Sequence, residues 1–216
     1  MNIVYNEDCM ITMDRLKEFK DRDILAICDP EYGDGENQLN FRYKNKKQYI
    51  NKAPDKKYFE ELFRISKNQI IWGGNYFTNK LPISKGWICW YKHQPVDNFS
   101  DFELAWSSFK IPTKLIDLPC YGFNHPDGKT IHCSQKPIAL YRWLLQNYAK
   151  PNNLIFDSHV GSGSSRIACY ELGFDFVGCE IDKDYWNDQE KRFKLEKAKI
   201  DNKFYLPEDE RNLFNV

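Results

Sequence analysis

A short polar turn, Asp29-Pro30-Glu31-Tyr32, follows the apolar run 24–28 and combines three groups that could hold an amino group on a flat ring. Such an amine is a weak nucleophile because its lone pair is delocalised into the ring. The carboxylate of Asp29 and the carbonyl of Pro30 could accept its two N–H bonds and so localise that pair, while the ring of Tyr32 stacks on the base. The turn therefore indicates chemistry on a nucleobase amine. The alternative is an ordinary β-turn, in which Asp-Pro and Gly are also common.

A glycine-rich segment, residues 157–165 (DSHVGSGSS), follows a second apolar run at 154–156. Gly161 and Gly163 allow the backbone to turn tightly and to approach a ligand without a Cβ in the way. A helix that begins here would also present free amides to the ligand. A turn followed by a simple helix cap is the alternative.

An acidic residue stands at the end of the next apolar run and favours a ligand at the glycine-rich turn. Glu180 could accept hydrogen bonds from both hydroxyls of a ribose, and Asp182 is a second candidate. Strand, turn, helix and acid together predict a nucleoside-containing cofactor. A dinucleotide fingerprint would place a third glycine where Arg166 stands, which disfavours NAD.

Short apolar segments rich in β-branched and aromatic residues position these turns. They predict buried strands at 24–28, 69–72, 87–91, 154–156 and 176–179. Helices are expected around 10–19, 55–67, 137–149, 163–173 and 183–199. The alternation predicts a single α/β domain over 1–216, with a doubly wound, mainly parallel, Rossmann-like sheet and helices on both faces. Ligands bind beyond the carboxyl ends of the strands in such folds.

Composition favours a packed globular protein. The chain has 216 residues, of which 42% are hydrophobic and 16% aromatic, and its formal net charge is zero. No apolar run approaches the roughly 20 residues that span a bilayer. The first ten residues also lack the pattern of a signal peptide, so we expect a cytoplasmic protein without a membrane partner.

Seven cysteines are dispersed without a CxxC pair, which is typical of reduced thiols, several of them in the core. Cys120, His125, His132 and Cys133 are close enough in sequence to be considered as zinc ligands. Their spacing does not match that of zinc sites, and the adjacent His-Cys pair gives poor tetrahedral geometry. We therefore expect no metal.

Taken together, these segments resemble the amino-methyltransferases of DNA, whose signature is Asp-Pro-Pro-Tyr combined with a glycine-rich cofactor turn. The catalytic turn precedes the cofactor turn, as in the circularly ordered group called the β class. Residues 134–137 (SQKP) resemble the segment before the cofactor turn. Residues 72–75 (WGGN) and 103–106 (ELAW) resemble sheet segments of orphan methyltransferases carried by phages and mobile elements. The resemblance runs from about residue 3 to residue 194.

The resemblance implies S-adenosyl-L-methionine as the cofactor and a flipped base in double-stranded DNA as the substrate, in a bacterial or phage-infected cell. The implied catalytic residues are Asp29, Pro30 and Tyr32. The implied cofactor-binding residues are Asp8, Cys9, Asp29, Ser134, Lys136, Asp157, His159, Gly161, Ser162, Gly163 and Glu180. Among these, Asp8 and Cys9 would lie near the adenine, Glu180 at the ribose, and Lys136 or Ser134 at the methionine carboxylate. Asp29, where cytosine-N4 members have Ser, favours adenine N6.

Two residues depart from the family pattern. Glu31 replaces the second proline, which would restrict Pro30 to an extended conformation and aim its carbonyl. His159 replaces a phenylalanine, and we expect its ring to form a wall of the cofactor site rather than to act as an acid or base.

Two segments are candidates for contacts with DNA. The loop 34–57 is basic: from Arg42 to Lys57 it holds seven basic residues and one acid, although a solvated loop would also fit. Residues 110–133 lie where this class places target recognition. So small a recognition segment suggests a short target, or a homodimer that shares recognition.

Three alternatives to an adenine-N6 enzyme remain open. The first is a cytosine-N4 DNA methyltransferase. The second is a catalytically weakened DNA-binding relic of the fold, because of Glu31. The third is a nucleotide-dependent oxidoreductase that uses the glycine-rich turn and Glu180, against which Arg166 and the Asp29 turn both count.

Overall fold

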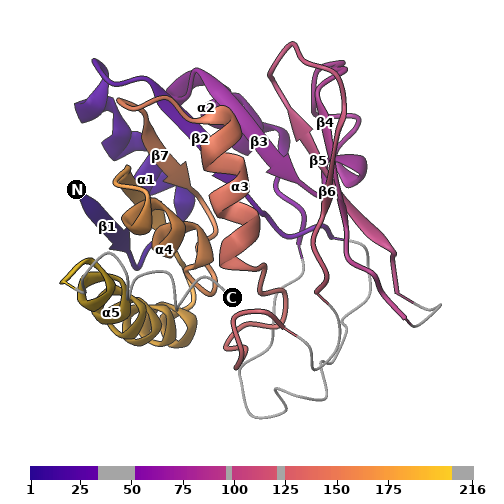
Figure 1. The fold of residues 1–216 in the computed structure, drawn as a ribbon. Coiled ribbons are helices and arrows are strands. Elements are labelled where there is room, and N and C mark those ends of the chain that lie inside the picture. The colour runs from indigo at the N-terminus through magenta and orange to yellow at the C-terminus, as the bar shows by residue number, and fades with distance from the viewer. Residues whose placement is uncertain (34–51, 96–98, 121–124, 206–216) are drawn as a thin grey trace.

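Eight strands form one sheet in the order β1-β8-β7-β2-β3-β5-β4-β6 in the computed structural model, which describes residues 1–33, 52–95, 99–120 and 125–205 (Figure 1). The strands are β1 (Asn2–Tyr5), β2 (Ile24–Cys28), β3 (Asn68–Trp72), β4 (Trp87–Tyr91), β5 (Phe102–Ser107), β6 (Lys114–Asp117), β7 (Leu154–Asp157) and β8 (Asp175–Cys179). The helices are α1 (Cys9–Arg15), α2 (Lys56–Ile65), α3 (Ile138–Tyr148), α4 (Ser164–Glu171) and α5 (Lys183–Tyr205), with 3-10 turns η1 (Leu16–Phe19) and η3 (Gly74–Tyr76).

Five strands, β1, β8, β7, β2 and β3, run parallel to one another, and β5 is antiparallel to β3 and β4 on its two sides. This confirms the predicted mainly parallel α/β sheet. The expected strands are all present, within a residue of their predicted bounds. The apolar runs do not indicate β1 and β6, four-residue edge strands in which only Val4 and Ile116 are buried. Strand β5 was indicated only by the resemblance of residues 103–106.

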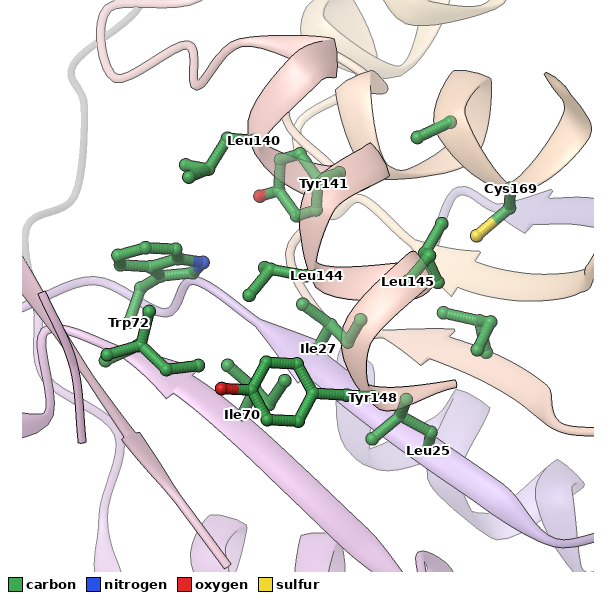
Figure 2. Close-up of a cluster of buried hydrophobic side chains, with 14 of the residues drawn as sticks. Leu25, Ile27, Ile70, Trp72, Leu140, Tyr141, Leu144, Leu145, Tyr148 and Cys169 are labelled. Atoms are coloured by element: carbon green, nitrogen blue, oxygen red, sulfur yellow. The ribbon is translucent and has the colours of Figure 1, made fainter. Parts of the chain in front are cut away.

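Alternate residues of the central strands face two separate cores, which is why the sheet carries helices on both faces. Ile24, Ala26 and Cys28 of β2 pack with buried residues of α1 and α2. Leu25 and Ile27 point to the other face, into the core that α3 and α4 cover. Figure 2 shows this second core, where Leu144 and Tyr148 of α3 lie over side chains of β2 and β3.

Leu140, Leu144 and Leu145 are each at most 1% exposed, and burying a leucine side chain stabilises a fold by about 1.5–3 kcal/mol. Helix α3 is therefore firmly seated on the sheet, and with it the residues just before its first turn. The longest helix, α5, packs on α4, and the indole Nε1 of its Trp186 donates to the carbonyl of Val4 at 3.1 Å.

The carboxyl ends of the five parallel strands share one edge of the sheet, so the segments that follow them are brought together. The segment 34–51 of the predicted basic loop and residues 121–124 of the predicted recognition segment lie outside the described residues. None of the helices over the described ranges is both long and apolar enough to cross a membrane. All seven cysteines are free thiols, and Cys28, Cys169 and Cys179 are buried.

Candidate active site

Asp29 lies at the end of β2 with both carboxylate oxygens engaged by side chains. Its Oδ1 accepts a hydrogen bond from the hydroxyl of Tyr32 at 2.9 Å, and its Oδ2 forms an ion pair with the ammonium of Lys136. Burial raises the pKa of Asp29, and the nearby charge of Glu103 raises it further, although Lys136 opposes both. Asp29 is thus a buried carboxylate that depends on its neighbours for its charge.

Lys136, two residues before α3, is the cation at the centre of this cluster, and its side chain is 4% exposed. Its ammonium also lies 3.1 Å from Glu103 of β5, and Glu103 is 3.1 Å from Lys92 on its other oxygen. Burial opposes the charge on Lys136, but Asp29 and Glu103 outweigh it and hold the lysine pKa above its ordinary value. The sequence singled out Asp29 and Lys136 but gave Glu103 and Lys92 no role.

Tyr32 packs against two other aromatic side chains. Its ring stacks on Tyr76 with centroids 4.8 Å apart and an interplanar angle of 12°, and it meets Phe77 edge-on at 6.2 Å. Gly73 has a φ of +67°, and a Cβ there would lie 2.1 Å from the Tyr32 ring. Glycine is therefore required at position 73 by both conformation and space. Pro30, between the acid and the ring, is buried.

The glycine-rich turn after β7 is organised by the buried carboxyl of Asp157. Its Oδ1 accepts from the backbone amide of His159 at 3.0 Å, and its Oδ2 accepts from the Ser165 hydroxyl at 2.6 Å. Burial raises the pKa of Asp157 to about 7. Gly161 and Gly163 have φ values of +52° and +78°, so the turn uses the left-handed region that glycine favours.

Glu180 follows β8, the strand next to β7, and forms a hydrogen bond with the glycine-rich turn. Its Oε2 accepts from the amide of Gly161 at 2.9 Å, and its Oε1 accepts from the amide of Asp182, also at 2.9 Å. Burial raises its pKa. The rival acid, Asp182, accepts from the amides of Asp184 and Tyr185 and so caps the start of α5.

A cavity of about 400 Å³ lies between α1, α2 and the glycine-rich turn, and Asp8, Cys9, Pro54, Tyr58 and His159 line part of it. This volume is within the range of small-molecule sites. Asp8 also caps α1 by accepting from the amide of Met10 at 2.8 Å. Burial raises the pKa of Cys9 to about 12, so this wall of the cavity carries a neutral thiol. The lining combines apolar side chains with two acids and two lysines, and together with the volume it fits the nucleoside part of a cofactor.

His159 lines the cavity and is linked by hydrogen bonds, through the Ser158 hydroxyl, to Tyr58. Its Nδ1 lies 2.8 Å from the Ser158 hydroxyl, which is 2.6 Å from the hydroxyl of Tyr58. Burial lowers the pKa of His159 to about 4, so the ring is neutral at neutral pH. A neutral ring can pack on an uncharged adenosine without a desolvation cost for charge.

The other predicted site residues lie around this edge in different environments. Ser134 is exposed, whereas Ser162 is buried in the turn, and its carbonyl accepts from Arg192 of α5 at 2.8 Å. Arg192 also forms an ion pair with Asp127 at 2.9 Å, a tie between α5 and the segment before α3 that the sequence did not indicate. The buried guanidinium of Arg166 donates to Asn2, the first residue of β1, and to Gln189 of α5.

The histidines and cysteines weighed as zinc ligands have other surroundings. His125 Nε2 lies 3.2 Å from the Gln135 carbonyl, and His132 Nδ1 accepts from the amide of Ser134 at 3.2 Å. Across the part of the chain that the structure describes, no group of three or more His, Cys, Asp or Glu side chains could hold a metal ion.

Fold and site together define a class of protein: an amino-methyltransferase, in which a partly buried acidic turn and a nucleoside-sized cavity share one edge of a doubly wound sheet. Residues 9–191 match the family model described as DNA methylase, of the N6/N4 type. The chain therefore belongs to the N6/N4 DNA methylase family, whose cofactor is S-adenosyl-L-methionine.

Individual relatives agree with this assignment. The chain is 22% identical over 246 residues to the type II methyltransferase M.HpaI of Haemophilus parainfluenzae, covering 91% of this chain and 74% of the relative. It is 34% identical over 64 residues to M1.MboII of Moraxella bovis, but that match covers only 28% of this chain and 25% of the relative. The solved complex of M1.HpyAVI with SAM has the same fold, with a TM-score of 0.63 and 20% identity over 89% of this chain and 98% of that one.

Proposed function

We propose that this chain is an S-adenosylmethionine-dependent DNA methyltransferase that methylates N6 of an adenine flipped out of duplex DNA. The observation that carries the proposal is the partly buried Asp29 at the end of β2, with the ring of Tyr32 beside it and a nucleoside-sized cavity at the same sheet edge. Asp29, in place of the serine typical of cytosine-N4 members, supports adenine as the target. Cytosine N4 is the alternative within the same family.

The chemistry follows from the groups of the turn. Bound S-adenosylmethionine supplies an electrophilic methyl group on a sulfonium. Asp29 and the carbonyl of Pro30 accept the two N–H bonds of the base amine, so its lone pair is directed at the methyl carbon, and Tyr32 stacks on the base. Tyr32 and Lys136 each bond one oxygen of Asp29, so the base amine would share an oxygen with one of them or displace it.

The cofactor would be held by the residues of the glycine-rich turn and the cavity. Asp8, Cys9 and His159 line the place proposed for the adenine. Glu180, which bonds the amide of Gly161 in the glycine-rich turn, is the acid proposed to bind the ribose, and Asp182, which caps α5, is its rival. Lys136 is the better placed of the two candidates for the methionine carboxylate, because its ammonium is already at Asp29 while Ser134 is exposed.

We also propose that the basic loop 34–57 contacts the DNA phosphates and that residues 110–133 read the target. A homodimer would enlarge this small reading surface. The orphan, phage-type origin and the cytoplasmic location expected from the sequence remain predictions.

The decisive experiment incubates the purified chain with mixed-sequence duplex DNA and methyl-labelled S-adenosylmethionine, and then identifies the modified nucleosides. We expect N6-methyladenine, and a loss of at least about 100-fold in the Asp29→Ala variant, the size of effect of one preorganised polar group. The thermal unfolding midpoint of Asp29→Ala should stay near that of the unmodified chain. Label in cytosine would refute the adenine assignment, and cofactor binding without transfer would favour the catalytically weakened relic.

A further inference from the structure

Glu103 is the charged residue of β5, whose sequence 102–107 is FELAWS, and nothing in the proposed chemistry uses it. It shares a sheet face with Ala105, two residues along β5, and that face packs beneath α3. The start of α3 brings Lys136 over this face, so that the ammonium lies between the carboxylates of Glu103 and Asp29. The strand thus places a second anion within reach of the same cation.

The cluster is electrically balanced. Asp29 and Glu103 supply two negative charges, and Lys136 and Lys92 supply two positive ones. Burial raises the pKa of Glu103, but the two lysines outweigh it and hold the pKa below its ordinary value, so Glu103 is ionised. Lys92 binds Glu103 Oε1 while Lys136 faces Oε2, so Glu103 is anchored on one oxygen and offers the other to Lys136.

While Tyr32 and Lys136 each bond one oxygen of Asp29, each oxygen keeps only one lone pair for an amine, and the nearby ammonium weakens the carboxylate as an acceptor. Removing a buried ammonium from all carboxylates would be costly, because an unpaired charge would be left in the interior. A short shift of Lys136 toward Glu103 avoids that cost, since the ion pair at 3.1 Å already exists.

We propose that Glu103 is a positioning residue for methyl transfer: it draws Lys136 away from Asp29 and so frees a carboxylate oxygen for the base amine. The expected effect of Glu103 on the transfer rate rests on the proposed function. Its expected effect on the pKa of Asp29 does not. Without Glu103, Asp29 is the one carboxylate of the cluster left beside Lys136, so the ion pair between them strengthens.

The test compares three single variants of the full-length chain in single-turnover assays at saturating DNA and cofactor. Glu103→Gln should lower the transfer rate by about 10- to 100-fold, the usual order for a misplaced catalytic group. Glu103→Asp, which keeps the charge, should recover part of that loss. The control is Glu171→Gln. The Glu171 side chain is about as exposed as that of Glu103 (27% against 25%) and forms an ion pair with Arg142, but it lies outside the site. The transfer rate of this variant should equal that of the unmodified chain.

Two further measurements separate positioning from a merely structural role. In a Lys136→Met background, Glu103→Gln should cause no further loss of rate, because the residue acts through Lys136; additive losses would overturn the proposal. A full rate in Glu103→Gln, or a loss matched by a lower unfolding midpoint, would also overturn it.

An NMR titration of the Asp29 carboxyl carbon needs no activity. Asp29 faces Tyr32, Lys136 and Glu103, with the charge of Asp157 further away. Its pKa should fall in Glu103→Gln, because a negative neighbour is lost and Lys136 pairs with Asp29 alone. An unchanged or raised pKa refutes the inference even if no methyl transfer is detected, whereas absent transfer with the expected pKa change refutes only the proposed function.

Discussion

The turns after β2 and β7 follow paired parallel strands, and each contains an aspartate whose pKa burial raises. They differ in what holds the carboxylates. Asp29 is bound by two side chains, Tyr32 and Lys136. At the glycine-rich turn, Asp157 accepts one bond from a backbone amide and one from the Ser165 hydroxyl. Both bonds to Glu180 come from backbone amides, one from Gly161 of the turn and one from Asp182 after β8.

Because of this difference, the turn after β2 can rearrange more easily than the turn after β7. A bond from a side chain breaks by a rotation about its χ angles, whereas a bond from a backbone amide breaks only when the loop itself changes conformation. The β2 turn therefore suits a group that must exchange partners during a reaction. The β7 turn suits a group that must present fixed amides to a ligand.

The largest effect that would test the comparison is expected from Glu180→Gln. The amides of Gly161 and Asp182 would lose a charged acceptor, which typically costs about 1.5–3 kcal/mol, so both stability and cofactor binding should suffer. We expect the dissociation constant for S-adenosylmethionine to rise at least about tenfold, equal to 1.4 kcal/mol. Calorimetric titration and urea unfolding measure the two effects, and Asp29→Ala should show no comparable loss of stability.

Asp182→Asn is the matched control for Glu180, because it weakens the cap of α5 without touching the turn. It should lower stability and leave the cofactor affinity nearly unchanged. If Asp182→Asn weakens the cofactor more than Glu180→Gln does, then the ribose acid has been assigned to the wrong residue.

A smaller effect is expected in the pH dependence of stability. The folded-state pKa of Asp157 is about 7, above the ordinary value of 3.8. Its contribution to stability is therefore complete below pH about 4 and is lost as the pH rises to about 7. Asp157→Asn removes this titration, so the free energy of unfolding should fall less between these two pH values than it does in the unmodified chain.

Urea unfolding at pH 4, 5.5 and 7 measures this difference. The Asn side chain keeps an oxygen for the amide of His159 and can donate to the Ser165 hydroxyl, so the turn should persist. Parallel curves for the two proteins would show that Asp157 is ionised throughout, and would remove one of the two buried acids on which the comparison rests.

The sequence predicted the main strands because their apolar runs are bounded by polar turns, and parallel strands place those turns at one edge. Asp29 and the glycine-rich turn could thus be assigned to a common site. The contact between Asp29 and Lys136 could not be derived, because it joins residues 107 positions apart through the docking of α3. A usable signal for Glu103 was its charge within the otherwise apolar strand 102–106, since a buried acid needs a partner. The edge strands β1 and β6 are too short and too exposed to give a pattern.

The smallest effect is expected from His159→Phe, which restores the ring that the family usually has. The variant loses the hydrogen bond between Nδ1 and Ser158 but keeps an aromatic wall and the backbone amide that binds Asp157. One neutral hydrogen bond contributes about 1 kcal/mol, so stability should fall by no more than that. Calorimetric titration should show cofactor affinity within about threefold of the unmodified chain, because the ring is neutral and makes no ionic contact. His159→Ala, which removes the wall, should weaken binding further. A loss of more than about tenfold in the Phe variant would mean that a ring nitrogen bonds the cofactor. The β7 turn would then bind its ligand through a side chain as well as its backbone, and the contrast with the β2 turn would be one of degree.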